Sequence, residues 1–185
     1  MIDPVVTAWQ SPSVERRPTL SLNEWAVLGL LAERPRHGYD IAAELRPDAE
    51  IGQVWRVSRQ IVYRALDRLA ALGLIEPRRH EPGDAGPRRT VYAPSRRGRA
   101  ALRRWLTRPV DHLRDVRGAL LLKLVLARRL GADTAELVAA QRDRFADQLA
   151  ALAPRPPAGD PVAGWRHHSA AAVDAFLAGL GGGDG

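Results

Sequence analysis

The sequence predicts a mainly α-helical protein, with an N-terminal winged helix-turn-helix that carries a two-stranded wing and a C-terminal helical region. Three observations lead to this fold class. Three short helical segments come first, two extended runs follow them, and the rest of the chain returns to helical periodicity. Helices followed by a hairpin in this order are typical of a winged helix-turn-helix, whose third helix enters the major groove of DNA.

The first two helices are marked by their ends. Ser21 and Glu24 have the capping-box spacing, in which each side chain bonds the backbone N–H of the other residue, and Pro35 stops the helical pattern. A second, shorter helix fits residues 39–45, because Pro47 follows it. The apolar positions of these helices are Trp25, Leu28, Gly29 and Ala32, then Ile41, Ala42 and Leu45.

The third helix is followed by a hairpin. Ser58 can cap this helix and Gly73 can end it. Extended runs over residues 74–80 and 89–94 flank a loop rich in Pro, Gly and charge, which predicts the hairpin, and Ser95 can then cap a fourth helix. The buried stripe of the third helix is Val62, Ala65, Leu66, Leu69 and Leu72.

Beyond residue 109 the pattern is helical. Residues 113–127 are apolar almost all round, which predicts burial on several sides. Further apolar residues recur at spacings of seven, four and three and resemble a surface for a partner helix: Val138, Phe145, Leu149 and Leu152. A stiff, proline-rich linker over residues 153–164 precedes a last amphipathic helix, with Trp165, Ala172, Val173, Phe176 and Leu180 on its apolar face. Dimerisation is the simplest use of these faces.

Four regions follow from these patterns. Residues 1–19 are expected to form a flexible N-terminal arm and residues 20–108 the winged helix-turn-helix domain. Residues 109–180 are expected to form a helical dimerisation domain, and residues 181–185 a disordered tail.

Positive charge is concentrated in one third of the chain. The segment from Gln53 to Arg108 contains 14 basic and 4 acidic residues, a net charge of +10, while the rest of the chain carries −3. Clustered arginines release counterions from a nucleic-acid backbone, so this asymmetry favours a DNA-facing segment. A uniformly basic chain would be weaker evidence.

The polar positions of the third helix fit base recognition. Arg59, Gln60 and Tyr63 lie off the buried stripe, with Arg64 beside them. Arg can grip guanine and Gln can grip adenine through paired hydrogen bonds, while Tyr can donate to phosphate. The alternative is a solvated charged helix, which the helix order, the Ser58 cap and the charged hairpin together disfavour. The hairpin arginines are Arg78, Arg79, Arg88 and Arg89.

Several short motifs carry a family resemblance. They are HGY at residues 37–39, WRVS at residues 55–58, and GPRRTVYAPSRRGRAAL through the hairpin and the next helix. In these segments the chain resembles the PadR family of bacterial transcriptional regulators. The resemblance implies a homodimer with a helical dimerisation region and, usually, repression that a small molecule relieves. It also implies DNA-backbone contacts by His37 and Tyr39, recognition-helix contacts by Ser58, Arg59, Gln60 and Tyr63, and wing contacts by Arg88 and Arg89.

Trp105 on the fourth helix is a candidate effector-binding residue. Dimers of the PadR family can enclose an aromatic-lined cavity, and a Trp from each subunit could sandwich a small aromatic or planar effector there. Arg104 or Arg108 could meet an anionic ligand. The alternative is that Trp105 packs between the two domains.

Other site chemistries find little support. The chain has no Cys, so disulfides, thiolate nucleophiles and Cys-ligated zinc are excluded. His167 and His168 are adjacent and cannot share a metal ion as residues four apart on a helix can. We therefore expect no enzyme, no metal site and no cofactor. The most apolar stretch, residues 119–127, is far shorter than the roughly 20 residues of a membrane span, and no secretory signal is visible, so we expect a cytoplasmic protein.

Together these patterns predict a sequence-specific regulator that binds double-stranded DNA. The expected form is a homodimeric, PadR-like repressor on a palindromic operator, relieved by a small-molecule effector. The alternative is a ligand-binding or protein-interaction module with a winged helix that does not regulate promoters.

Overall fold

The computed structural model describes residues 19–83 and 86–181, and the side chains of these residues except 81–88. Nearly all of the predicted arm and tail lies outside the described residues. The described part is mainly helical with one small antiparallel sheet, which confirms the predicted fold class. In chain order the elements are α1 (Leu22–Glu33), β1 (Arg36–His37), α2 (Gly38–Glu44), α3 (Glu50–Val54), α4 (Arg59–Ala71), β2 (Ile75–Gly83), β3 (Gly86–Pro94), α5 (Arg96–Thr107), a 3-10 turn (Leu113–Asp115), a π-helical turn (Val116–Leu120), α6 (Leu121–Arg129), α7 (Ala135–Leu152) and α8 (Pro161–Gly181).

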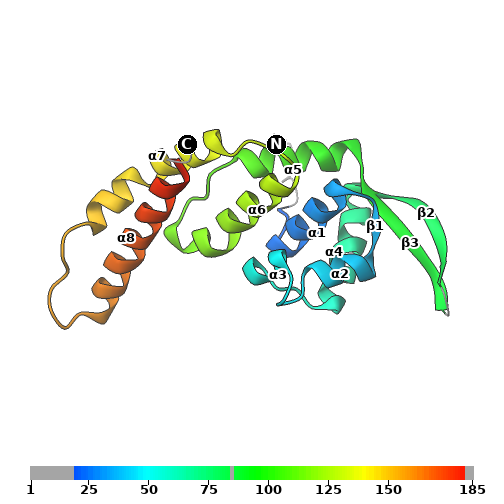
Figure 1. The fold of residues 1–185 in the computed structure, drawn as a ribbon, viewed down its shortest axis with the longest axis horizontal. Helices are drawn as coiled ribbons and strands as arrows, with labels where there is room; N and C mark the ends of the chain where they lie inside the picture. Colours follow the sequence, from blue (N-terminus) through cyan, green and yellow to red (C-terminus); the bar gives the residue numbers. More distant parts are fainter. Residues whose placement is uncertain (1–18, 84–85, 182–185) are drawn as a thin grey trace, which may run out of the picture.

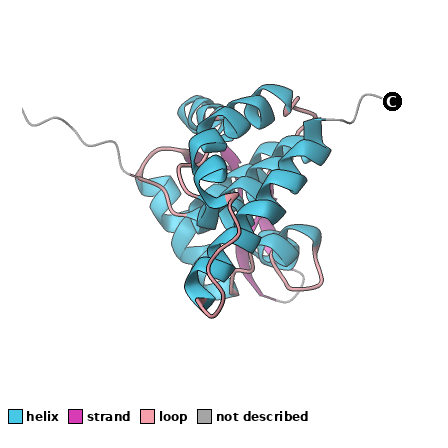
Figure 2. Ribbon diagram, turned by 90° about the vertical axis from the view of Figure 1, so that its left-hand side faces the viewer, coloured by secondary structure: helices cyan, strands magenta, loops and turns pink. Residues whose placement is uncertain are grey.

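The sheet and the last two helices occupy opposite ends of the molecule (Figure 1). From the end that carries α7 and α8, the strands lie behind the helices (Figure 2). None of the described helices is both long and apolar enough to cross a membrane.

The capping signals predicted from the sequence are present at two helices. The Ser21 N–H donates to Glu24 Oε2 at 2.6 Å, and the Glu24 N–H donates to Ser21 Oγ at 3.4 Å, which completes the capping box of α1. Ser95 Oγ accepts the Gly98 N–H at 3.0 Å and so caps α5. Ser58 occupies the N-cap position of α4, but its side chain makes no capping hydrogen bond. Gly73 follows α4 with a φ of 64°, a conformation that favours glycine.

Two elements ahead of α4 were not predicted. The five-residue helix α3 makes α4 the fourth helix rather than the third, because α3 contains a glycine and is too short to show a helical period. Strand β1 adds a third strand to the predicted two-stranded wing. Arg36 pairs with Tyr92 and His37 with Val91, so β1 joins β3 of the wing directly to the start of α2.

The buried side chains form two clusters. The first cluster is built on α1, which is buried on nearly all sides rather than on the one face predicted, because α4, α5 and α6 surround it. Leu122 and Leu126 of α6 belong to this first cluster, although the sequence predicted that α6 is part of the C-terminal domain. The second cluster comprises Val110, Val116, Leu120, Leu137, Phe145 and Leu177.

The last helix differs from its predicted form. It begins at Pro161, inside the predicted linker, and packs on α7 through the face that carries Ala170 and Leu177. Trp165, which is 75% exposed, and Leu180, which is 41% exposed, were both predicted to lie on the apolar face of this helix, and neither is buried in the single chain. Val162 is also exposed, and we name these three side chains, two near the start of α8 and one near its end, the outer stripe of α8.

Candidate DNA-binding surface

Helix α4 has one buried face and one basic, exposed face. Val62, Ala65, Leu66 and Leu69 are buried, as the predicted stripe requires. Arg59, Gln60 and Arg64 are exposed on the other face, and Ser58 is exposed at its start. The first turn of α4 contains no acidic residue, so nothing on this turn repels an approaching phosphate.

Arg59 lies between two tyrosine rings from different helices. Its guanidinium carbon is 5.5 Å from the ring centroid of Tyr39 and 5.8 Å from that of Tyr63. Both distances are within the range of cation–π attraction. Tyr63 can approach the start of α2 because residue 38 is glycine; a Cβ there would lie 2.9 Å from Tyr63 Cε1. The structure thus brings three of the predicted contact residues, Tyr39, Arg59 and Tyr63, into one group.

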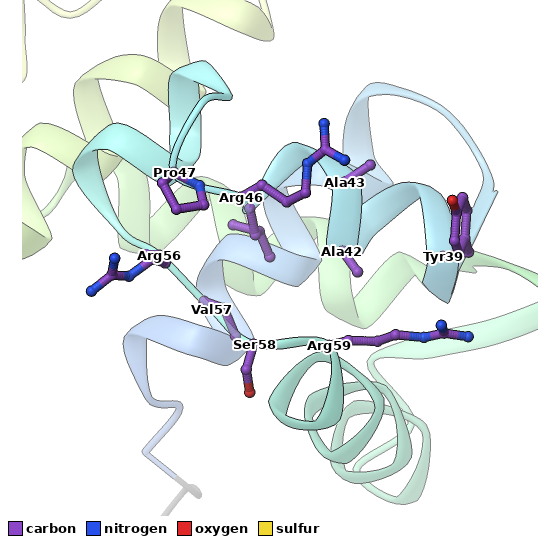
Figure 3. Close-up of a pocket in the computed structure, with 10 residues that line it drawn as sticks. Tyr39, Ala42, Ala43, Arg46, Pro47, Arg56, Val57, Ser58 and Arg59 are labelled. Atoms are coloured by element: carbon purple, nitrogen blue, oxygen red, sulfur yellow. The ribbon is translucent and has the colours of Figure 1, made fainter.

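A hollow of about 410 Å³ lies between α2 and the turn that leads into α4. Three arginines line it, and Figure 3 shows Arg59 directed towards Tyr39 while Arg56 points to the opposite side. Arg46 is the third and forms an ion pair with Asp48 at 3.0 Å. Sequence reasoning missed Arg46 and Arg56, although Arg56 stands two residues before the predicted cap, because the turn after α3 was not recognised. The lining residues are Tyr39, Ala42, Ala43, Leu45, Arg46, Pro47, Arg56, Val57, Ser58 and Arg59.

The remaining predicted contact residues lie on β1 and the wing. The side chain of His37 is only 16% exposed, and its Nδ1 lies 3.3 Å from Asp40 Oδ2. Arg89 is exposed on β3, two residues before Val91, the register partner of His37. Arg88 lies on the same strand, but its side chain is outside the described residues.

The candidate effector residue Trp105 packs inside the chain. Its ring stacks on Trp25 of α1, with centroids 4.9 Å apart and planes 11° apart, and Lys123 Nζ lies 5.0 Å from the Trp105 centroid. This contact joins α1, α5 and α6, as the packing alternative requires. Arg104 and Arg108 are exposed. The role of these three residues in effector binding stays a prediction.

Lys123, the only lysine of the chain, is buried. Its Nζ donates a hydrogen bond to the carbonyl oxygen of Arg108. The pKa of Lys123 is lowered from 10.5 to about 8: burial is the main cause, the charge of Arg108 adds to it, and the charge of Asp111 opposes it. The folded chain therefore holds this proton less tightly than the unfolded chain does.

We expect Lys123→Met to raise the free energy of unfolding at pH 7 by about 1–3 kcal/mol, because methionine fills the same space without a buried charge. Since the folded pKa is depressed, the stability of the unsubstituted protein should rise with pH from about 8 towards 10.5, and the variant should lack this rise. Urea denaturation at pH 7 and pH 9.5 measures both effects. A methionine variant that is less stable at pH 7 would contradict the expectation.

Helices α1 to α5 and the wing form a winged helix-turn-helix, a class of DNA-binding domain. Residues 27–104 match the family described as Transcriptional regulator PadR-like family. Over these residues the chain is similar to the PadR-like family of transcriptional regulators.

Individual relatives were found by sequence and by structure. The Probable transcriptional regulator Rv1176c of Mycobacterium tuberculosis is 33% identical over 102 residues, which cover 52% of this chain and 49% of that protein. The chain thus spans about half the length of this curated relative. Bacillus subtilis PadR in complex with operator DNA has a TM-score of 0.45 and 21% identity, covering 86% of this chain and 97% of that chain. The smu.1604c protein of Streptococcus mutans has a TM-score of 0.42 and 16% identity, covering 85% and 96%.

Proposed function

We propose that the protein is a sequence-specific transcriptional regulator that acts as a homodimeric repressor on a palindromic operator. The observation that carries this proposal is the exposed face of α4, where Arg59 lies between Tyr39 and Tyr63. A guanidinium held in this way loses little further freedom when it bonds a guanine edge. The family match over residues 27–104 supports the same function.

The hollow beside α4 suits a phosphate of the DNA backbone. The first N–H groups of a helix have no partner within the helix, and the side chain of Ser58 does not cap them here. Helix N-termini and arginines both bind phosphate. We therefore add Arg46 and Arg56 to the proposed contacts, with Arg89 reaching the backbone from the wing.

The outer stripe of α8 supports the homodimer. Val162, Trp165 and Leu180 leave apolar surface exposed on an element far from the sheet (Figure 1). Two copies that meet through this stripe would each present one α4. In such a dimer the two copies of α4 would enter successive major grooves, about 34 Å apart.

Relief of repression would require an effector that binds one arrangement of the dimer better than the other. In this proposal a planar aromatic acid binds near Trp105, where stacking and the charges of Arg104 and Arg108 favour it. p-Coumaric acid, which is bound in a solved structure of Bacillus subtilis PadR, is a probe of this chemistry.

Trp105→Ala is expected to weaken the displacement of DNA by p-coumaric acid at least about 10-fold, because the stacking surface is lost. DNA binding without the acid should remain. Titration of the acid into a preformed protein–DNA complex measures the response. Trp105→Phe is the control for packing against Trp25, and an unchanged response in the alanine variant would remove Trp105 from the proposed site.

The proposed function is tested by fluorescence anisotropy on a labelled duplex from upstream of the protein's own gene. Scrambled duplex serves as competitor, and the titration is repeated across a salt series. Binding that resists the competitor and weakens steeply with salt would establish a sequence-specific regulator. To allow for an operator elsewhere in the genome, the same titration is repeated with a pool of labelled genomic fragments. Equal affinity for all fragments would favour the interaction-module alternative.

A further inference from the structure

A ring of ion pairs joins the end of α6 to the elements that carry the proposed DNA contacts. Arg129 of α6 meets three carboxylates from separate helices: its Nε is 2.6 Å from Glu33 Oε1, and its Nη1 is 3.1 Å from Glu44 Oε2 and 3.5 Å from Glu50 Oε2. Its Nη2 also donates to Glu33 Oε2 at 2.9 Å, so the contact with Glu33 is bidentate. A single side chain of α6 thus holds the end of α1 and the end of α2.

Arg36 of β1 closes the ring from the opposite side. Its side chain is 3% exposed, and its two terminal nitrogens reach the same pair of carboxylates, at 2.7 Å to Glu33 Oε2 and 3.2 Å to Glu44 Oε1. Each glutamate is therefore shared by both arginines. Two arginines and two glutamates therefore alternate around the ring, and their formal charges cancel.

The pKa shifts of Glu44 and Arg129 both favour the charged forms of these two groups. Burial would raise the pKa of Glu44, but the hydrogen bonds and charges of Arg129 and Arg36 outweigh burial and lower it. Burial would lower the pKa of Arg129, but the hydrogen bonds and charges of Glu33 and Glu44 raise it. Planar guanidinium groups suit such shared, bidentate pairing better than an ammonium does.

Helix α2 depends on contacts of this kind. It has seven residues, no side-chain cap and only two buried residues, Gly38 and Ile41. A helix this short is not stable by itself, so tertiary contacts must fix its place. The ring supplies contacts at both ends of the segment: Arg36 lies in β1, directly ahead of the helix, and Glu44 is the last residue of α2, whose second residue is Tyr39.

We infer that Arg129 is a positioning residue, which fastens α2 to α6 and thereby sets where Tyr39 holds Arg59. This inference rests on the proposed function, since it assigns Arg129 a part in DNA binding without contact to DNA. It gives the C-terminal helices a direct mechanical connection to the DNA-facing surface. A shift of α6 that separates Arg129 from Glu44 releases one end of α2.

The test compares Arg129→Gln with Arg128→Gln in the full chain. Arg128 is the matched control, because it precedes Arg129 and its substitution removes the same charge. Its side chain is 68% exposed and forms an ion pair with Glu50, which is also the weakest of the three partners of Arg129 by distance. Hydrogen exchange of the amides in residues 38–45 reports the placement of α2, and anisotropy on the operator duplex reports DNA binding. The first measurement needs no DNA and stays interpretable if the proposed function fails.

In Arg129→Gln we expect faster exchange in residues 38–45 and unchanged exchange in residues 62–69 of α4. Affinity for the operator should fall about 3- to 30-fold, with an unchanged salt slope because no phosphate contact is lost. Arg128→Gln should match the unsubstituted protein in both measurements. Arg129→Lys keeps the charge but cannot bridge both glutamates, so it should resemble Arg129→Gln, and it replaces that variant if the glutamine protein does not fold.

Three outcomes would overturn the inference. The first is unchanged exchange in residues 38–45 of Arg129→Gln. The second is an equal effect of Arg128→Gln, which would reduce the result to a general loss of charge. The third is faster exchange together with full operator affinity, which would separate α2 placement from DNA binding. An unsubstituted protein with no preference for any DNA would instead refute the proposed function, while the exchange data would still decide whether Arg129 holds α2.

Discussion

Substitution of Arg59, Gln60 and Tyr63 by alanine together is expected to lower operator affinity at least about 100-fold, to the level of scrambled DNA. All three are exposed in the first two turns of α4, and none contributes to the buried stripe. The variant loses both proposed bidentate base contacts and the Tyr63 ring that lies beside the Arg59 guanidinium. Competition anisotropy measures the affinity, and sedimentation velocity checks that association of the protein is unchanged.

Arg142→Ala is the matched control for charge. Arg142 is an exposed arginine on α7, outside the winged helix-turn-helix, so its loss should change operator affinity less than about twofold. Arg59→Lys separates charge from shape: lysine keeps the charge but loses the planar, five-donor guanidinium that lies near both tyrosine rings. Specific affinity should fall while binding to scrambled DNA stays the same. Full operator affinity in the triple variant would contradict the contact assignment.

Phe145→Ala is expected to lower the free energy of unfolding by about 3–5 kcal/mol. Phe145 is fully buried in the second cluster, between α7, α8 and the turns that follow α5. Its removal leaves a cavity that the surrounding leucines cannot fill without moving their helices. Urea denaturation at several protein concentrations measures the loss.

Trp165→Ala is the comparison for Phe145→Ala. Trp165 is also a large aromatic residue of the C-terminal helices, but it is 75% exposed in the single chain. At low protein concentration its loss should cost less than about 1 kcal/mol. A larger cost that grows with protein concentration would be the signature of the proposed dimer. A loss below about 1 kcal/mol in Phe145→Ala would contradict its place in the core.

Local signals made much of the fold predictable. The capping box at Ser21 and Glu24, the Ser95 cap and the left-handed Gly73 each depend on residues within one or two turns, so the sequence displays them directly. Helix α3 and strand β1 are too short to produce a period. Their formation depends on neighbours that the chain supplies much later, as when Val91 pairs with His37.

The site was predictable to a similar extent. The polar positions of α4 follow from its buried stripe, and Arg59, Gln60, Tyr63 and Arg64 are exposed as that stripe requires. The group formed by Tyr39 and Arg59 was not predictable, because these residues lie on different helices. The ring of ion pairs was missed for the same reason, since Glu33 and Arg129 are 96 residues apart in the chain.

The exposed stripe of α8 shares no residue with the DNA-facing surface of α4. In the proposed dimer, Arg59 and Gln60 determine which bases each subunit prefers. The contact of Trp165 and Leu180 with the same residues of the second copy determines the distance between the two half-sites. Mutations can then change base preference and half-site spacing independently of each other. A lineage can adopt an operator with a longer spacer through changes in the last 25 residues of the chain while its half-site sequence stays fixed.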